Sequence, residues 1–245
     1  MKTFYDIAFL EDEGLGTAYE YYVKRKFLER IIKMTGDPKK ICIFGLPQKF
    51  GLSMDFCLLA SDYKSDVTVI EERDISLNRF EEVLNVLKKN KIISDINLTK
   101  NNDLKDKNEY DLLLNTEVMH KYSDDEIKKI IEKTADSAKI TIYFIPNPDN
   151  VNRIKSSNSQ NLKFNELIKD LKDKYEIIEY GYMDMPPFPS GVKMSNTDKG
   201  KMKKAETFMI LVFLFLKIWS LWEKILPSFI KKKFAHVSYV AIMKK

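Results

Sequence analysis

Cysteine and histidine are scarce in this 245-residue chain, which contains two of each. A structural zinc site needs about four Cys or His ligands, and His120 and His236 do not cluster with Cys42 and Cys57 in the sequence. We therefore expect no metal site. Both cysteines lie inside apolar runs, so we interpret them as small buried side chains in a reducing compartment and not as a disulfide.

A strong charge imbalance and a signal peptide are also missing. The net charge of +5 is too small to indicate nucleic-acid binding by itself, and most of the excess lies beyond residue 195. The first six residues lack the apolar core of a secretory signal peptide. We expect a cytoplasmic protein that does not bind nucleic acid.

The sequence does contain an alternation of two hydrophobic patterns. Short apolar runs predict strands over residues 41–44, 67–70, 92–98, 110–114, 139–145 and 175–183. Apolar residues at helical spacing predict helices over residues 18–34, 52–60, 76–89, 123–134 and 161–173. Ser123 and Glu126 have the spacing of a capping box at the start of one of these helices. The alternation predicts one α/β domain with a parallel sheet.

Ligands of open parallel sheets bind outside the carboxyl ends of the strands, where the strand order reverses. The turn after the first predicted strand begins at Gly45 and contains Gly51, and glycine lets a backbone turn sharply and approach a ligand closely. Glu71 ends the second strand, where an acid accepts hydrogen bonds from a ribose diol in dinucleotide folds. This edge of the sheet is therefore the candidate site.

The order of three sequence blocks resembles that of the class I S-adenosylmethionine-dependent methyltransferases. The blocks are residues 41–45 (ICIFG), 69–71 (VIE) and 110–120 (YDLLLNTEVMH), and residues 139–146 and 236–243 resemble two later strands of that family. The resemblance covers residues 37–183 and 235–245. It implies a Rossmann-like three-layer sandwich with a mostly parallel seven-stranded sheet, an antiparallel last strand and a helical insertion before that strand.

The same resemblance implies that S-adenosylmethionine is the cofactor. By position in the family's motifs, its binding residues would be Gly45, Gly51, Glu71, Asn115 and Thr116.

One histidine at this edge has two interpretations. His120 is either a general base, because an imidazole titrates near neutrality, or a histidine at the start of a helix. The chain also departs from the family's pattern: Ile43 stands where an acid is usual, and Pro47 and Lys49 stand where glycines are usual.

Residues 1–36 are predicted to form a helical lid over this domain. Tyr19 and Tyr21 in it either reach the cofactor or pack in the core.

Residues 184–234 form a basic and apolar helical insertion before the last strand. Its apolar run, residues 208–216, is too short to span a bilayer, which takes about 20 residues. Trp219, Trp222 and the flanking lysines favour a helix that lies on an anionic membrane surface, with a protein interface as the alternative.

Two hypotheses about function follow. The first is a peripheral methyltransferase at the inner face of the cell membrane, attached through residues 205–230, which methylates an amphipathic or lipid-linked acceptor. The second is a catalytically inactive protein of the same fold that acts as a membrane-tethered binding or scaffold subunit, which the departures at Ile43, Pro47 and Lys49 favour. A nicotinamide-dependent oxidoreductase is weaker, because the first turn lacks Gly-x-Gly-x-x-Gly. An oligomer is compatible with either hypothesis.

Overall fold

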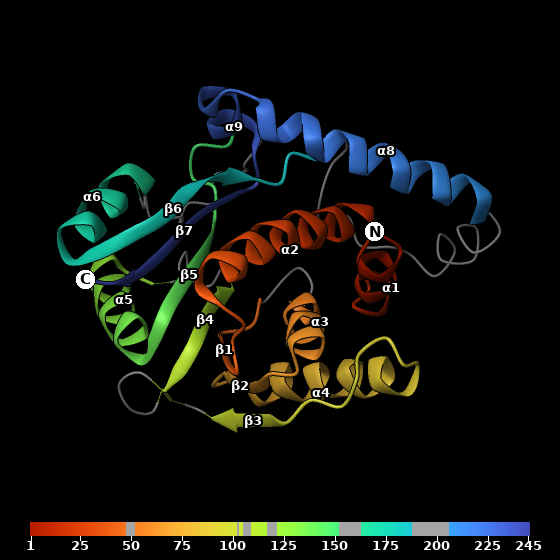
Figure 1. Cartoon of the computed structure of the whole chain (residues 1–245), viewed down its shortest axis with the longest axis horizontal. Coiled ribbons are helices and arrows are strands. Elements are labelled where there is room, and N and C mark those ends of the chain that lie inside the picture. The colour runs from red at the N-terminus through yellow and green to blue at the C-terminus, as the bar shows by residue number, and fades with distance from the viewer. Residues whose placement is uncertain (48–51, 102, 105–108, 117–121, 152–162, 188–205) are drawn as a thin grey trace.

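The centre of the molecule is a seven-stranded sheet in the order β3-β2-β1-β4-β5-β7-β6 (Figure 1). The computed structural model describes residues 1–47, 52–101, 103–104, 109–116, 122–151, 163–187 and 206–245. Its strands are β1 (Lys40–Phe44), β2 (Asp66–Ile70), β3 (Leu98–Asn101), β4 (Tyr110–Thr116), β5 (Ala138–Pro146), β6 (Tyr175–Met183) and β7 (Val237–Lys244). β7 runs antiparallel to both of its neighbours, and the remaining pairs are parallel. The predicted Rossmann-like sheet with an antiparallel last strand is confirmed.

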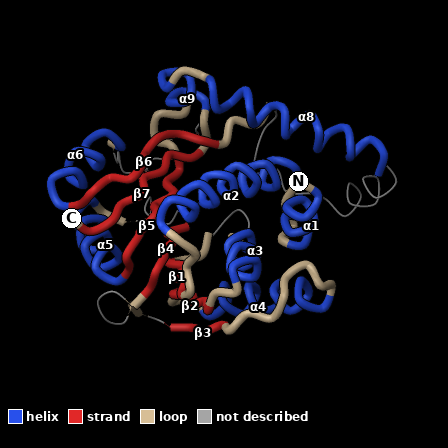
Figure 2. The backbone as a smooth tube through the Cα atoms, in the orientation of Figure 1, coloured by secondary structure: helices blue, strands red, loops and turns tan. Residues whose placement is uncertain are grey.

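Helices cover both faces of the sheet and complete a three-layer sandwich (Figure 2). The described helices are α1 (Lys2–Leu10), α2 (Leu15–Thr35), α3 (Met54–Tyr63), α4 (Asp74–Lys89), α5 (Asp124–Ser137), α6 (Phe164–Lys174), α8 (Glu206–Ile225) and α9 (Ser228–Phe234). Side chains alternate between the two faces along each strand. Ile41 and Ile43 join the core that contains α1 to α4, whereas Tyr143 and Ile145 pack with α5 and α6.

The third strand lies later in the chain than the sequence predicts. A strand over residues 92–98 is wrong, because Ile93 and Ile96 are buried in the core from a loop, at 2% and 7% exposure. The strand itself, β3, is at the edge of the sheet, and its side chains are half-buried or exposed. An edge strand need not be apolar, so the apolar pattern indicated the buried loop.

Two local predictions are confirmed. The Ser123 side chain accepts a hydrogen bond from the Glu126 backbone N–H, and the Glu126 carboxylate accepts from the Ser123 N–H at 2.8 Å, which completes the capping box. Cys42 and Cys57 are buried and free. Burial raises the pKa of both thiols, so neither is a reactive thiolate.

The chain leaves the sheet for the insertion and returns to it at the same edge. β6 and β7 are antiparallel neighbours in which Met183 pairs with Val237, and α8 and α9 lie between these two residues in sequence. Both ends of the insertion therefore belong to one side of any membrane. Within the described residues, no helix combines the length and the apolar character needed to cross a bilayer.

Candidate functional site

The site predicted from the sequence lies at the point where the strand order reverses: β1 has β2 on one side and β4 on the other. Gly45 follows β1 with φ +76°, a conformation that favours glycine. Its N–H donates to the Ile70 carbonyl oxygen at 2.8 Å, and its own carbonyl oxygen accepts a hydrogen bond from the Thr116 hydroxyl. The ends of β1, β2 and β4 are thus joined by hydrogen bonds through Gly45.

Glu71 lies at this edge, directly after β2, and its side chain is 6% exposed. Arg73 holds both carboxylate oxygens: Nε donates to Oε1 and Nη2 donates to Oε2, each at 2.7 Å. Oε2 also accepts from the Leu46 N–H at 2.8 Å, and Arg73 Nη2 donates to the Leu46 carbonyl oxygen at 2.6 Å. Burial opposes ionisation of Glu71, but the hydrogen bonds from Arg73 and Leu46 outweigh it and lower the pKa.

Asn115 provides the second polar side chain at this edge. It follows Leu114 near the end of β4, pairs in register with Phe44 of β1, and is fully buried. Among the described residues, neither its amide nitrogen nor its oxygen has a hydrogen-bond partner. A buried carboxamide without a partner costs about 1–3 kcal/mol, so Asn115 is a candidate to bind a ligand at this edge.

The segment after the first turn is fixed by a residue from the N-terminus. The Glu11 carboxylate accepts hydrogen bonds from the Leu52 N–H at 2.6 Å, the Met54 N–H at 3.1 Å and the Tyr21 hydroxyl at 2.5 Å. It therefore caps the start of α3, the helix that follows the first turn. Burial raises the pKa of Glu11 to about 7, against the lowering effect of these hydrogen bonds.

Asp55, in the first turn of α3, gives a prediction about pH. It is 3% exposed, its Oδ1 has no partner in the described part of the chain, and burial raises its pKa from 3.8 to about 7. The folded protein then holds a proton that the unfolded chain releases, so Asp55 lowers the free energy of unfolding as the pH rises from about 4 to about 7. Asp55→Asn should flatten this decline and be more stable than the parent at pH 8, measured by urea unfolding. Asp170→Asn, at an exposed position, is the control and should follow the parent curve.

The structure brings part of the predicted site together. Gly45, Glu71, Asn115 and Thr116 all lie at the carboxyl ends of β1, β2 and β4. Gly51 and His120 lie outside the described residues. Their roles stay predictions.

Asp111, in the third sequence block, and the two tyrosines of the predicted lid have structural contacts. The Asp111 carboxylate accepts from the backbone N–H groups of Lys39 and Lys40 and pairs with Lys139, which agrees with a structural role. Tyr19 and Tyr21 are buried, so the core-packing alternative holds for both.

Sequence reasoning missed Arg73 and Glu11. Arg73 stands two residues after Glu71, a spacing at which its guanidinium can reach back to the carboxylate, so inspection of the residues after the strand-end acid would have found it. Glu11 is 41 residues from Leu52 in sequence, and no local pattern indicates that contact.

The inner face of α8 is anchored to the domain by a buried carboxylate. Glu223, 5% exposed, accepts from the Tyr19 hydroxyl at 2.5 Å, the Asp184 N–H at 2.8 Å and the Met185 N–H at 3.2 Å. Trp219 Nε1 donates to the Met185 carbonyl oxygen at 2.6 Å.

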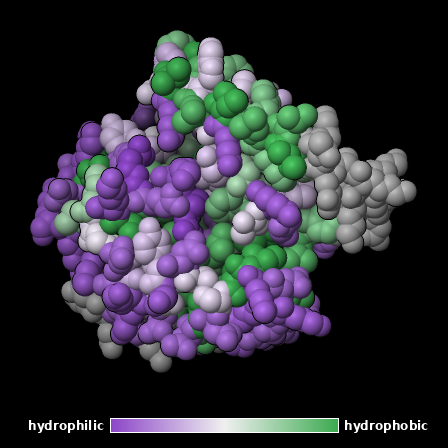
Figure 3. Space-filling view, turned by 45° about the vertical axis from the view of Figure 1, so that its right-hand side comes forward, coloured by the Kyte–Doolittle hydropathy of each residue, from purple (hydrophilic) through white to green (hydrophobic). Residues whose placement is uncertain are grey.

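The opposite face of α8 carries large apolar side chains that are 49–75% exposed. We call it the apolar face, and it consists of Ile210, Leu211, Leu214, Phe215, Ile218, Leu221, Trp222 and Ile225. Figure 3 shows hydrophobic surface along the upper edge of the molecule, over this helix. An exposed apolar stripe of this size on one helix indicates an interaction surface.

Comparison with solved structures shows which class of fold this architecture belongs to. No protein-family model and no curated protein matches the chain. The magnesium protoporphyrin IX methyltransferase ChlM from Synechocystis PCC 6803 with bound SAH has a TM-score of 0.55, at 8% identity, over 94% of this chain and 85% of its own. The same enzyme with bound SAM has a TM-score of 0.52, at 9% identity, over 94% and 81%. YjhP from E. coli also has 0.52, at 15% identity, over 91% and 92%.

The chain therefore has the fold of the class I S-adenosylmethionine-dependent methyltransferases, as its sequence blocks predict. Identities this low show the fold alone, so the function has to be argued from the site.

Proposed function

We propose that this protein is an S-adenosylmethionine-dependent methyltransferase that acts on an amphipathic or lipid-linked acceptor at a membrane surface. The observation that supports it best is the pair of polar side chains, Glu71 and Asn115, at the carboxyl edge of a sheet with this fold. In such sheets this edge is where nucleotide-type ligands bind.

The residues at this edge fit the cofactor. Glu71 would accept hydrogen bonds from the ribose diol, and the unpartnered carboxamide of Asn115 offers a buried donor and acceptor. Gly45, whose φ is +76°, and Thr116 would line the pocket with backbone. Arg73 occupies both oxygens of Glu71, so its guanidinium has to rotate away before the carboxylate can take a ribose.

The protein's main contribution to the reaction would be to align the methyl donor with the acceptor. S-adenosylmethionine supplies a methyl group that its positively charged sulfur activates for transfer to a nucleophile. The chain would hold donor and acceptor in one pocket, which converts a bimolecular step into an effectively unimolecular one. We propose that His120 removes the acceptor's proton when that acceptor must lose one.

The membrane half of the proposal is supported by α8. Its apolar face is exposed, and Lys217 and Lys224 stand beside it, where they complement anionic lipid. Both ends of the insertion meet the same edge of the sheet, so the helix would lie in the interface and not cross it. A helix in that position would bring an acceptor with an apolar tail to the domain.

A second function has a specific observation in its favour. Each Glu71 oxygen already accepts two hydrogen bonds, all from Arg73 and the Leu46 N–H, so the carboxylate as folded has no acceptor position left for a ribose. Pro47 also removes one backbone donor from the first turn. A protein of this fold that has lost cofactor binding, and serves as a membrane-tethered scaffold, would show these features.

Calorimetric titration of the purified chain separates the two functions. S-adenosylmethionine and NAD are titrated separately into the protein. Micromolar binding of S-adenosylmethionine alone supports the methyltransferase. If neither compound binds, the scaffold is favoured, and binding of NAD alone would contradict both.

Substitutions at Glu71 and Arg73 test the assignment of the site. Glu71→Ala should weaken S-adenosylmethionine binding by about 1.5–3 kcal/mol, as for hydrogen bonds to a charged group. Arg73→Ala should instead strengthen it, because the carboxylate no longer has to give up an ion pair first. The gain should vanish in the double variant, which a calorimetric double-mutant cycle measures. An Arg73→Ala gain that survives without Glu71 removes Glu71 from the site.

A further inference from the structure

α2 and α8 lie side by side on one face of the molecule (Figure 1). One hollow lies between them, and a second lies beside α1, α2 and α3 and reaches Lys217 of α8. The first has a volume of about 380 Å³ and is lined by α2, β6, β7, α8 and α9; the second, of about 530 Å³, is lined by α1, α2, α3 and α8. Lys26 lines both, so we treat them as one basic groove. Its cationic side chains are Arg25, Lys26, Arg30, Lys217, Lys224 and Lys231.

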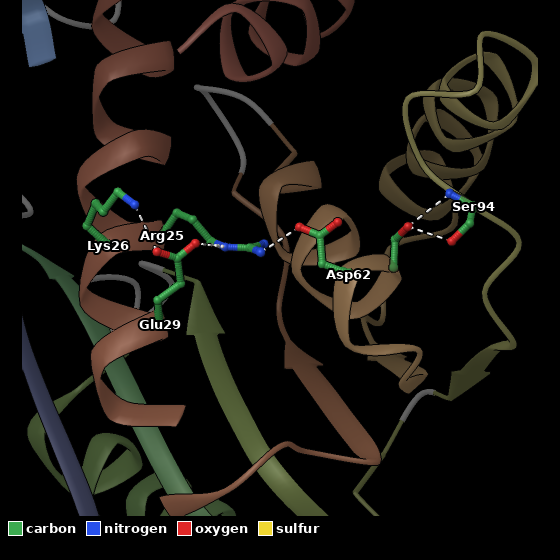
Figure 4. A network of polar contacts seen from close by, with 6 residues as sticks. Arg25, Lys26, Glu29, Asp62 and Ser94 are labelled. Atoms are coloured by element: carbon green, nitrogen blue, oxygen red, sulfur yellow. Dashed lines mark hydrogen bonds and ion pairs between the residues drawn. The ribbon is translucent and has the colours of Figure 1, made fainter. Parts of the chain in front are cut away.

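The carboxylates of the groove neutralise the α2 side. Glu29 lies between Arg25 and Lys26, 3.0 Å from a nitrogen of each (Figure 4). Arg25 also contacts Asp62 at 2.5 Å. Arg30 pairs with Glu179 at 2.5 Å, and Glu223 is turned inward to Tyr19.

On the α8 and α9 side the compensation is weaker: the Glu223 and Glu179 carboxylates act on Lys231 through space and without an ion-pair contact among the described residues. Within the described part of the chain, Lys217, Lys224 and Lys231 form no ion pair. Lys231 Nζ donates only to the Lys224 carbonyl oxygen, at 3.0 Å, and burial lowers its pKa. On this wall three lysines face one carboxylate, Glu223, which is hydrogen-bonded to Tyr19, so this side of the groove has a net positive charge.

The groove also adjoins the apolar face. Lys217 and Lys224 are seven residues apart, so they lie on the same flank of α8, between its buried face and its apolar face. A ligand that placed an anion between these lysines would have apolar side chains such as Leu221 directly beside it. This combination matches an anionic head with an apolar tail, whereas a free anion would use only the lysines.

We propose that the basic groove binds the phosphate of an anionic phospholipid, whose acyl chains contact the apolar face of α8. The proposal rests on the membrane half of the proposed function and is independent of methyl transfer. It defines the ligand of the groove as a phosphate-bearing lipid and assigns the phosphate to Lys217, Lys224 and Lys231.

The test uses the full chain and vesicles of phosphatidylcholine with and without phosphatidylglycerol. Lys217→Gln/Lys224→Gln keeps the length of both side chains and removes two charges. Each lysine near an anionic surface is worth about fivefold in affinity, so the pair should weaken binding to phosphatidylglycerol vesicles by about 25-fold. Binding to pure phosphatidylcholine vesicles should stay unchanged.

The control changes the net charge equally but on the other side of the sheet. Lys128→Gln/Lys169→Gln removes two exposed lysines from α5 and α6 and should bind like the parent. If the groove variant also binds phosphatidylglycerol vesicles like the parent, the groove is not a lipid phosphate site. Inorganic phosphate is titrated calorimetrically in parallel: micromolar binding that the groove variant loses would indicate a site for a free anion and overturn the lipid assignment.

The outcomes separate this proposal from the proposed function. Loss of vesicle binding on substitution of the apolar face, with none on substitution of the lysines, keeps the membrane helix and rejects the groove. A parent that binds no vesicles rejects both. Failure to bind S-adenosylmethionine rejects methyl transfer and leaves the lipid result as measured.

Discussion

Glu223→Ala is expected to lower the free energy of unfolding by about 3 kcal/mol or more, because it leaves several buried donors without an acceptor. Glu223 is 5% exposed and takes hydrogen bonds from the Tyr19 hydroxyl and from the N–H groups of Asp184 and Met185. These contacts join α8 to α2 and to the end of β6. Urea unfolding followed by tryptophan fluorescence measures the loss, since both tryptophans of the chain are in α8.

Two matched variants show whether the carboxylate itself is responsible. Lys224→Ala changes the next, exposed residue and should alter stability by no more than about 0.5 kcal/mol. Glu223→Gln keeps the shape and one acceptor oxygen but turns an NH₂ group toward donors, so its stability should lie between parent and Glu223→Ala. If Glu223→Ala unfolds like the parent, the packing of Leu216 and Met209 suffices to hold α8, and the hydrogen bonds of Glu223 do not contribute to the free energy of unfolding.

The same contacts explain why deletion of the insertion is a poor test of its role. Removal of residues 206–230 takes away the acceptor of the Tyr19 hydroxyl and uncovers the surface beneath Leu216, which is fully buried. A deleted protein that fails to bind membrane may simply have lost part of its fold. Point substitutions on the exposed face avoid this.

The central strands could be predicted because of where they lie. β1 and β4 have neighbours on both sides and helices on both faces, so their sequences are continuous apolar runs, such as residues 41–44. β3 has one neighbour and little burial, and nothing in its residues Leu98–Asn101 distinguishes it from a loop. Hydrophobicity indicates burial, and it indicates a strand only where strand and burial coincide.

The orientation of α8 shows another limit. Met209, Leu216 and Glu223 are spaced by seven residues and are all buried, so Glu223 lies on the inner face. In the sequence Glu223 simply follows the apolar residues that end at Trp222, and nothing there marks it as buried. The helix is apolar on nearly every side, so its periodicity does not reveal which face packs on the domain.

The position of the candidate site follows from the fold, but the contacts that Arg73 and Leu46 make with Glu71 are part of no sequence motif. Glu71 was predicted because strand ends of a parallel sheet converge at one edge, and Asn115 because of its position in the third sequence block. Arg73 is as important as either, because its ion pair decides whether Glu71 is accessible. Its effect depends on the rotamer of one side chain, which the sequence does not specify.

The apolar face of α8 is expected to hold the protein on a membrane, and Leu214→Gln/Ile218→Gln/Leu221→Gln should strongly weaken that binding. These side chains are 55%, 52% and 60% exposed. Burial of a large apolar side chain contributes about 1.5–3 kcal/mol. Even at a third of that value for partial insertion, three substitutions should weaken vesicle binding by more than about tenfold. Co-sedimentation with phosphatidylglycerol vesicles measures this loss.

The control removes the same number of exposed apolar side chains elsewhere. Met34→Gln/Ile75→Gln/Val86→Gln changes α2 and α4 at 59%, 86% and 40% exposure and should bind vesicles like the parent. Thermal stability should change little in either triple variant, because none of the six side chains is buried. Equal vesicle binding by both variants would mean that the apolar face does not meet lipid.

Depth of insertion distinguishes lipid from a protein partner on this face. Trp222 is 61% exposed on the apolar face, whereas Trp219 donates to Met185 from its edge. Brominated lipids quench tryptophans within the bilayer, so they should quench the parent and quench Trp222→Phe much less. If neither is quenched and size-exclusion chromatography shows self-association that the Gln triple variant loses, the face is an interface between copies of the chain.

Protease digestion from each side of sealed vesicles tests whether the helix crosses the bilayer. Antiparallel neighbours in one sheet cannot lie on opposite sides of a membrane. A result that places residues 237–244 across the bilayer from residues 175–183 would therefore contradict the pairing of β6 with β7.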